Sequence, residues 1–439
     1  MSEQSVQELL SLAYEYHRAG QSADAEDLYK QILAEDPEQP DALYLLGILL
    51  FQSQRKQEAA FCLQRAAESH PDNVEILSSL GSVRVDLGDY DAAIPVLKTA
   101  MAAAPTNPKP LSLLGEVFLK MQRFEDAAEI LESLSALLPA AAGGWYNLGR
   151  AYEGLGRLED AVAAFDEAVK RKPDFADAYS AAAAALLRLD RPVDALEASR
   201  ECVERAPDDV RGLASMVVAF EALGEDAVAE SLVNFERFVR IGRIEPPQDY
   251  EDLDAFNAAL VEHILAQPTL QGDTQAAYFR GASISGKLAA GTDGPIAVFK
   301  EMMVEAFHGY RRRLPKRSEH PFAIAVPERW ELHLWATVMD DGGYQAPHIH
   351  PAAWLSGVYY AAVPETVTAD DSDHQGWLEL GMPPDDYPAP KTPLVQRFMP
   401  EAGKLVLFPS YIYHRTIPHE TGGRRVSIAF NIEPVRASE

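Results

Sequence analysis

The chain has 439 residues, enough for two or three domains, and a formal net charge of −28 at pH 7. This charge would repel a phosphate backbone, so nucleic acid is excluded as an expected partner. A membrane-spanning helix needs about twenty consecutive apolar residues, and no stretch of the sequence approaches that length. The first residues do not have the pattern of a secretory signal. With only two cysteines, Cys62 and Cys202, a disulfide framework is excluded. We therefore expect no membrane contact and a cytoplasmic location.

The first half of the chain is periodic. Prolines recur every 34 residues, and glycine and alanine recur at fixed places between them. This is the period of tetratricopeptide repeats, in which each unit supplies two helices and a proline ends the second. The pattern predicts six repeats from about residue 6 to 209 and a seventh, atypical unit that caps the array. The prolines are Pro37, Pro71, Pro105, Pro139, Pro173 and Pro207.

Stacked repeats bury a continuous core and curve into a concave groove. We expect first-helix side chains such as Tyr44, Tyr146 and Arg150 to face that groove. Such grooves usually bind peptides, so a protein or peptide partner is our first hypothesis. The alternative is that the array forms a homo-oligomer or only holds the second half of the chain. Prolines and charges at 243–249 break the pattern, which places the all-α solenoid at 1–242.

Residues 243–320 are expected to link the array to the C-terminal domain and to support it. Apolar residues at helical spacing predict one helix over 253–265 and another over 296–307. A basic run at 311–317 is unusual in so acidic a chain. It is either a solvated helix end or a surface that docks an acidic partner.

Histidines and strand patterns characterise residues 321–439. His348 and His350 are two residues apart, and on an extended strand such residues point to the same side, so both rings can reach one metal ion. His414 follows an apolar run at 403–409 that is typical of a buried strand. Two histidines and one carboxylate bind the metal of many non-haem Fe(II) oxygenases. The three imidazoles predict such a site, with a histidine at the usual carboxylate position.

The third ligand has alternatives. His350 either binds the metal directly or lies just outside it, with a water completing the coordination. A carboxylate of Asp340 or Asp341 could serve instead, although both precede the metal-binding segment. His419 lies in a turn-rich loop and is expected to be solvated.

Arg425 and Ser427 share one face of the strand that follows His414. A guanidinium matches a carboxylate, and a nearby hydroxyl adds a further hydrogen bond. This pair would anchor the far carboxylate of 2-oxoglutarate. Tyr359 or Tyr360 could add another hydrogen bond, and because the strand register is open we only favour Tyr360.

Together these motifs resemble the 2-oxoglutarate/Fe(II) dioxygenases that follow tetratricopeptide repeats in bacterial proteins. The resemblance covers residues 321–439 well and is looser from about residue 250. More distantly, the chain is similar to the aspartyl/asparaginyl β-hydroxylases. The resemblance implies a double-stranded β-helix, a cupin-like jelly roll, with buttressing helices. It also implies decarboxylation of 2-oxoglutarate coupled to hydroxylation by molecular oxygen. The residues that carry it are His348, His350, Leu355, Gly357, Tyr360, Trp377, Pro400, Gly403, Ser410, His414, Arg425, Ser427 and Asn431.

The sequence thus predicts an Fe(II)- and 2-oxoglutarate-dependent dioxygenase that hydroxylates a protein or peptide side chain presented by the repeats. One rival is a three-histidine cupin-type dioxygenase that needs no keto acid, which the missing carboxylate favours and Arg425 opposes. Another is a repeat scaffold whose jelly roll is an inactive docking module. The residues assigned to Fe(II) are His348, His350 and His414, and those assigned to 2-oxoglutarate are Arg425, Ser427 and Tyr360.

Overall fold

The computed structural model describes residues 3–272, 279–288, 294–315, 318–388, 393–418 and 422–435, so His419 lies outside the described residues. By its contacts the chain divides into two compact units, Met1–Pro173 and Asp174–Glu439. The boundaries expected at 242 and 320 follow sequence patterns rather than contacts, and they stay predictions. None of the helices described is both long and apolar enough to cross a membrane.

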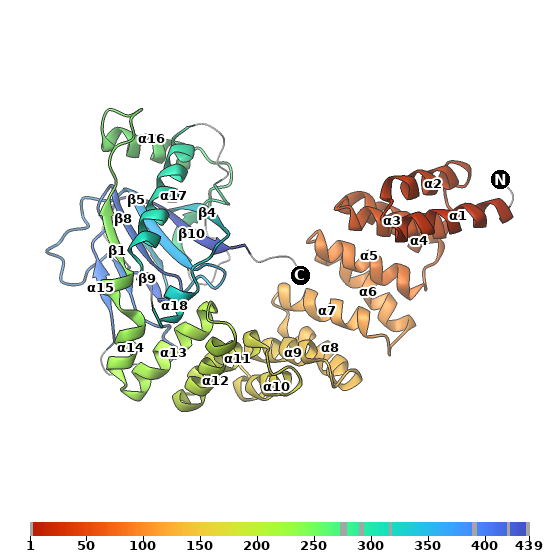
Figure 1. Ribbon diagram of the computed structural model, residues 1–439, viewed down its shortest axis with the longest axis horizontal. Helices are drawn as coiled ribbons and strands as arrows, with labels where there is room; N and C mark the ends of the chain where they lie inside the picture. Colours follow the sequence, from red (N-terminus) through yellow and green to blue (C-terminus); the bar gives the residue numbers. More distant parts are fainter. Residues whose placement is uncertain are drawn as a thin grey trace. The chain divides into compact units, whose positions relative to one another are not determined.

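The described part of the N-terminal unit consists of antiparallel helix pairs, which confirms the predicted tetratricopeptide solenoid (Figure 1). In most pairs the two helices meet at a glycine, and the first pair has Ala13 in its place. A Cβ added to Gly81 would lie 2.3 Å from Cδ2 of Leu97, so only glycine permits this approach. The helices are α1 (Glu3–Arg18), α2 (Ser22–Glu35), α3 (Pro40–Gln52), α4 (Lys56–Ser69), α5 (Val74–Asp86), α6 (Tyr90–Ala103), α7 (Pro108–Lys120), α8 (Phe124–Leu137), α9 (Ala142–Gly154) and α10 (Leu158–Arg171).

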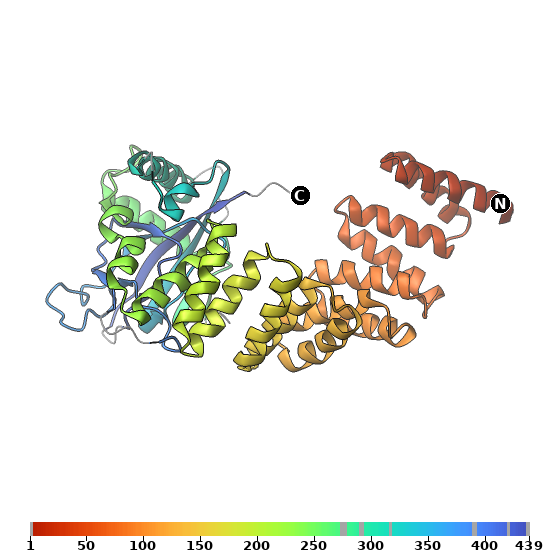
Figure 2. The same ribbon diagram turned by 60° about the horizontal axis from the view of Figure 1, so that its bottom comes forward.

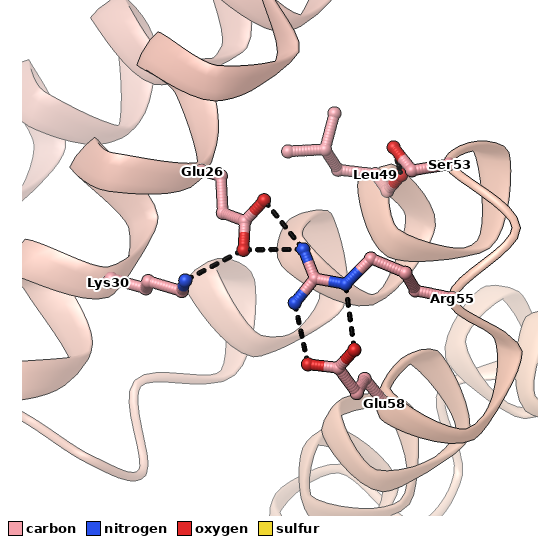
Figure 3. Close-up of polar contacts among 6 residues, drawn as sticks. All are labelled: Glu26, Lys30, Leu49, Ser53, Arg55 and Glu58. Carbon is pink, nitrogen blue, oxygen red and sulfur yellow. Dashed lines mark hydrogen bonds and ion pairs between the residues drawn. The ribbon is translucent and has the colours of Figure 1, made fainter.

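Successive repeats are also joined by ion pairs. Arg55, just before α4, donates through Nη1 to both carboxylate oxygens of Glu26 on α2, at 2.8 Å each (Figure 3). Its Nε and Nη2 bind Glu58 of α4 at 2.7 and 2.6 Å. The guanidinium therefore bridges two repeats, although its partial exposure limits what the bridge adds to stability. Three later arginines at the repeat spacing pair with an aspartate three residues on: Arg123, Arg157 and Arg191.

The C-terminal unit begins with the last complete repeat, α11 (Ala176–Arg188) and α12 (Pro192–Arg205), and the predicted cap, α13 (Val210–Leu223) and α14 (Asp226–Val233). Gly224 ends α13 in the left-handed conformation, with φ of 76°. A short helix, α15 (Phe235–Phe238), then leads into the first strand, β1 (Arg240–Arg243). That strand belongs to the sheet of the second domain, a pairing that the sequence pattern did not reveal.

Two antiparallel sheets form the body of the C-terminal unit. The larger has the order β1-β8-β5-β10-β4-β3-β2 and the smaller the order β7-β6-β9. From β5 onward the chain passes repeatedly between the sheets, the winding that the predicted jelly roll has. The remaining strands are β2 (Gln271–Gly272), β3 (Phe279–Ile284), β4 (Trp330–Gln345), β5 (Leu355–Ala362), β6 (Leu378–Leu380), β7 (Gln396–Phe398), β8 (Lys404–Pro409), β9 (His414–Thr416) and β10 (Arg425–Pro434).

Helices cover one face of the larger sheet, as expected for buttresses (Figure 1). They are α16 (Leu253–Leu265), α17 (Pro295–Arg313) and α18 (Pro321–Ile324). Phe299 of α17 packs on Tyr359 of β5, with ring centroids 5.1 Å apart, and Tyr359 Oη donates to Asn257 of α16 at 2.5 Å. Because side chains alternate along a strand, Tyr360 points to the opposite face.

The cap packs against the sheets, and α13 to α15 lie beside them in both views (Figures 1 and 2). Arg188 of α11 pairs with Asp386 at 2.8 Å, in the connection between β6 and β7. Tyr411 Oη donates to the carbonyl of Leu232 on α14 at 2.6 Å. These contacts hold the segment that precedes His414, so the last repeats form one structural body with the sheets.

A further contact of this kind should make the stability of the C-terminal unit depend on pH. The Glu221 side chain on α13 is 3% exposed, and its Oε1 accepts from the Leu394 N–H at 2.9 Å. Burial raises the pKa of Glu221 to about 7 from 4.5. The folded state therefore holds this proton more tightly than the unfolded chain, and the stabilising effect of protonation is lost as pH rises from about 5 to 8.

We expect Glu221→Gln to raise the melting temperature at pH 8 and to change it little at pH 5. The amide oxygen can still accept from the Leu394 N–H, and the side chain carries no buried charge at any pH. Avoiding that charge at pH 8 should stabilise the folded state by roughly 3 kcal/mol, at about 1.4 kcal/mol per pKa unit. Thermal unfolding across this pH range measures the effect. The control is Glu225→Gln, the same substitution at a nearby exposed glutamate. A pH-independent shift would contradict the raised pKa.

Candidate metal centre and anion pocket

A cavity lies between the two sheets and contains all the residues assigned from the sequence to metal and keto acid. Its free volume of about 30 Å³ holds an ion or a water molecule, so a larger ligand requires lining side chains to change rotamer. The larger sheet supplies most of the lining, and the smaller sheet supplies Leu378, His414 and Thr416. The other lining residues are Trp335, Thr337, Gln345, His348, His350, Ser356, Gly357, Val358, Tyr360, Phe408, Arg425, Ser427 and Ala429.

Three imidazoles converge in this cavity. The ring nitrogens of His348, His350 and His414 that could bind a metal all lie within 4.8 Å of one another. Backbone hydrogen bonds in both directions join His348 to His414, at 3.1 and 3.0 Å, and a bond of 3.4 Å runs from His350 N to Ser410 O. These bonds hold the segment after β4 against β9. They bring His348 and His350 next to His414, which follows them by 66 and 64 residues in the sequence.

Two of the rings have a defined tautomer. Nδ1 of His348 lies 2.8 Å from the Ala346 carbonyl, and Nδ1 of His414 lies 3.2 Å from the Ile412 carbonyl. A carbonyl only accepts, so each Nδ1 carries the proton and each Nε2 carries the lone pair. His350 differs, because its Nε2 lies 3.1 Å from His414 Nε2, and a bound metal would take the place of the proton between these two nitrogens.

Burial keeps the histidines neutral. It lowers the pKa of His348 to about 4 and that of His350 to about 3, and it lowers the pKa of His414 well below its usual value. Neutral imidazole is the form that binds metal. Two nitrogens bound at about 2.1 Å and at about a right angle would lie about 3 Å apart, close to the separation of the His350 and His414 nitrogens. The donor set therefore fits a divalent transition metal.

Carboxylates do not join the three histidines within the part of the chain that the structure describes. The Asp340 carboxylate, one of the alternatives for the third ligand, is exposed and pairs with Arg424 at 2.9 Å. The side chain of Asp341 lies outside the described residues. Among the described residues the group therefore consists of three imidazoles alone.

Arg425 is a buried cation that forms no ion pair with an acidic side chain among the described residues. Its side chain is 3% exposed, and Nη1 donates to the Gly376 carbonyl at 2.7 Å while Nη2 donates to Thr416 Oγ1 at 2.8 Å. Its Nε has no hydrogen-bond partner in the described structure. Burial lowers the pKa of the Arg425 guanidinium, which shows that its charge is poorly solvated. An anion that entered this cavity would compensate the charge.

Hydroxyl-bearing side chains surround this guanidinium. Ser427 and its neighbours across the sheet, Thr337 of β4 and Tyr360 of β5, share one face. The Arg425 guanidinium lies 5.7 Å from the centre of the Tyr360 ring, and Thr337 Oγ1 is buried without a hydrogen-bond partner in the described structure. The structure places Tyr360, rather than Tyr359, in the cavity. An oxyanion near Arg425 would therefore find several donors.

Sequence reasoning missed two lining residues that share this chemistry. Thr416 follows His414 by two residues on β9, and Thr337 follows Trp335 by two residues on β4. Both pairs lie on strands, so alternation along a strand could have identified both threonines. The Gly376 carbonyl had no such signal, because it comes from an irregular loop.

Comparisons with known proteins agree with this division of the chain. Residues 333–431 match the family described as "Putative 2OG-Fe(II) oxygenase". Tetratricopeptide-repeat families match residues 16–81 and 84–142, 57–108, and 142–175. No curated protein is similar enough to the chain to count as a match.

Solved structures resemble the repeats. MamA from Desulfovibrio magneticus RS-1, residues 41 to the end, is 25% identical over 38% of this chain and 94% of its own, with a TM-score of 0.37. A tetratricopeptide repeat protein from Parabacteroides merdae is 17% identical over 52% and 90%, with a TM-score of 0.42. YrrB, described as a TPR protein with an unusual peptide-binding site, is 20% identical over 42% and 95%, with a TM-score of 0.39.

Proposed function

Since the chain joins tetratricopeptide repeats to a 2OG-Fe(II) oxygenase segment, we propose that it is an Fe(II)- and 2-oxoglutarate-dependent dioxygenase that hydroxylates a protein or peptide side chain. The observation that carries this proposal is one cavity with two complementary features. Three neutral imidazoles in its lining offer lone pairs to a metal, and a guanidinium in the same lining, without an acidic partner among the described residues, offers charge to a carboxylate.

In this proposal His348, His350 and His414 hold Fe(II), and Arg425, Ser427 and Tyr360 bind the far carboxylate of 2-oxoglutarate. Bound Fe(II) and 2-oxoglutarate supply the activation of molecular oxygen, with succinate and carbon dioxide as co-products. The chain orients the keto acid through Arg425 and excludes bulk water through the apolar lining, such as Phe408 and Leu378.

The substrate is proposed from the repeats. Tetratricopeptide arrays present a concave surface that suits an extended peptide, and catalysis on a side chain requires that the peptide be held while the reacting carbon enters the cavity. The free, buried thiols of Cys62 and Cys202 suit a reducing compartment, so we place the protein in the cytoplasm. Homo-oligomerisation through the array is the alternative use of this surface.

The direct test is anaerobic titration of the metal-free protein with Fe(II) and then 2-oxoglutarate. Chelation of iron by the keto acid gives a weak visible charge-transfer band, which we expect to appear at one equivalent per chain. A band that requires both additions supports the proposal. Iron binding without the band would instead favour the three-histidine dioxygenase that needs no keto acid, and no iron binding would leave the jelly roll as a docking module.

A further inference from the structure

Two arginines without an acidic partner among the described residues, Arg240 and Arg313, line one groove beside the edge strand β1. Four other arginines of the C-terminal unit, Arg188, Arg397, Arg415 and Arg424, each pair with an aspartate or glutamate. In the described structure no ion pair with an acidic side chain involves the arginines at the start of the sheet or at the end of α17. These six are Arg237, Arg240, Arg243, Arg311, Arg312 and Arg313.

A groove of about 230 Å³ runs between β1 and the end of α17. Its floor is apolar, formed by Tyr310 of α17 and by Leu405 and Leu407 of β8. Arg240 and Arg313 line the same groove from its two sides. Such a groove suits an apolar side chain whose neighbours carry negative charge.

The groove borders an open sheet edge. β1 pairs with β8 on one side, and on its other side no strand follows among the described residues (Figure 1). Its middle residue Ile241 is 54% exposed. An unpaired edge offers main-chain donors and acceptors to an added strand. Because β1 is itself basic, two such edges would repel each other, which disfavours pairing of β1 with its own copy.

We propose that this edge and groove bind an extended acidic peptide segment of a partner protein. The segment adds as a strand to β1, places one apolar side chain over Gly242, where the space above the backbone is open, and directs carboxylates to Arg240 and Arg313. The site is separate from the repeat groove and from the metal centre. It gives a use to the basic run that the sequence showed near residue 311, and the overall charge of −28 makes its basic character distinctive.

Fluorescence anisotropy with labelled peptides of about six residues, the usual strand length, tests the proposal. We expect a peptide of alternating glutamate and leucine to bind, a lysine–leucine peptide not to bind, and affinity to fall as salt screens the charges. The double variant Arg240→Glu/Arg313→Glu should weaken binding about tenfold or more, since like charges would then face each other. Arg18→Glu on α1 changes the same charge elsewhere and should have no effect.

Backbone methylation separates strand addition from simple charge attraction. Methylating alternate amides on one edge of the acidic peptide removes its ladder hydrogen bonds and keeps its charge. There are two ways to methylate every second amide of the peptide. Only the pattern that blocks the amides facing β1 should weaken binding, again about tenfold. This arm uses the unaltered protein, so it remains informative if the charge-reversed variant misfolds.

Several results would overturn the proposal. They are equal binding of all methylated peptides, no binding of the acidic peptide, and binding that Arg240→Glu/Arg313→Glu leaves unchanged. Preferential binding of a single-stranded oligonucleotide would also do so. If the protein dimerised without any peptide and the double variant abolished the dimer, the occupant of the site would be a second copy of the chain.

Discussion

Alanine in place of His414 is expected to abolish Fe(II) binding and all turnover of 2-oxoglutarate. The His414 ring lies at the junction of the smaller sheet and the segment after β4, with its Nδ1 proton bound to a carbonyl. Its Nε2 lone pair is therefore oriented before metal arrives. Loss of a hydrogen bond that orients a ligand already weakens metal binding about 10–100-fold, so loss of the ligand should exceed about 100-fold. Anaerobic calorimetric titration with Fe(II) measures the affinity.

The matched control is His333→Ala. His333 lies on β4, where its ring contacts Glu331 at 3.1 Å and Glu433 at 3.2 Å rather than the cavity. This variant should bind Fe(II) as the unaltered protein does. If His414→Ala also retained full affinity with intact folding, the three histidines would not be the metal site, and the cavity would need another explanation.

The same geometry predicts a smaller effect at His350. Among the described residues its ring has no carbonyl contact of the kind that fixes the other two, and in our proposal it takes the usual carboxylate position. His350→Asp should therefore retain much of the metal affinity, whereas His348→Asp should lose it, because the shorter side chain cannot replace a ring held by the Ala346 carbonyl. Equal losses in both variants would indicate that all three imidazoles are required. This comparison also shows whether His350 binds the metal directly or lies just outside it, with a water completing the coordination.

Local periodicity predicted most of the fold because it reflects burial. The 34-residue period identified the repeats, and helical spacing identified α16 over the residues where the structure has it. Strand β1 was missed because it has only four residues, two of which are arginines, and so short a segment shows no alternation of apolar residues. The packing of α13 and α14 on the β6–β7 connection was missed as well. It depends on contacts between residues far apart in sequence, such as Glu221 and Leu394.

The candidate site shows the same limit. Two-residue spacing predicted that Arg425 and Ser427 share a face of β10, because alternation along a strand is a local property. The strand expected at His348 and His350 was wrong, since β4 ends at Gln345 and only an isolated bridge joins His348 to His414. The choice between Tyr359 and Tyr360 required the register of β5 against β10, in which Ser427 faces Tyr360. The uncompensated charge of Arg425 could not be predicted at all. It depends on which side chains line a cavity whose walls come from both sheets, and none of the described lining residues is acidic.

That charge leads to the second large effect, at Arg425. Arg425→Gln should raise the KM for 2-oxoglutarate about 30-fold or more, since removing one partner of a buried charge-assisted contact costs about 2–5 kcal/mol. It should not weaken Fe(II) binding, because the three imidazoles are unchanged. The folded protein without keto acid should lose little stability, as the variant removes a buried charge that no described acidic residue compensates. Succinate formation and calorimetric titration measure the two properties separately.

Arg424→Gln is a stringent control for this prediction. Arg424 adjoins Arg425 in sequence, but its Nε pairs with the exposed Asp340, outside the cavity. Its loss should leave the KM unchanged. Thermal unfolding gives a second measure, because a ligand that binds only the folded state raises the melting temperature in proportion to its affinity. We expect 2-oxoglutarate to stabilise the iron-loaded protein and the Arg424 variant but not the Arg425 variant. Equal stabilisation of all three would place the keto acid elsewhere and favour a reaction that uses the histidines without it.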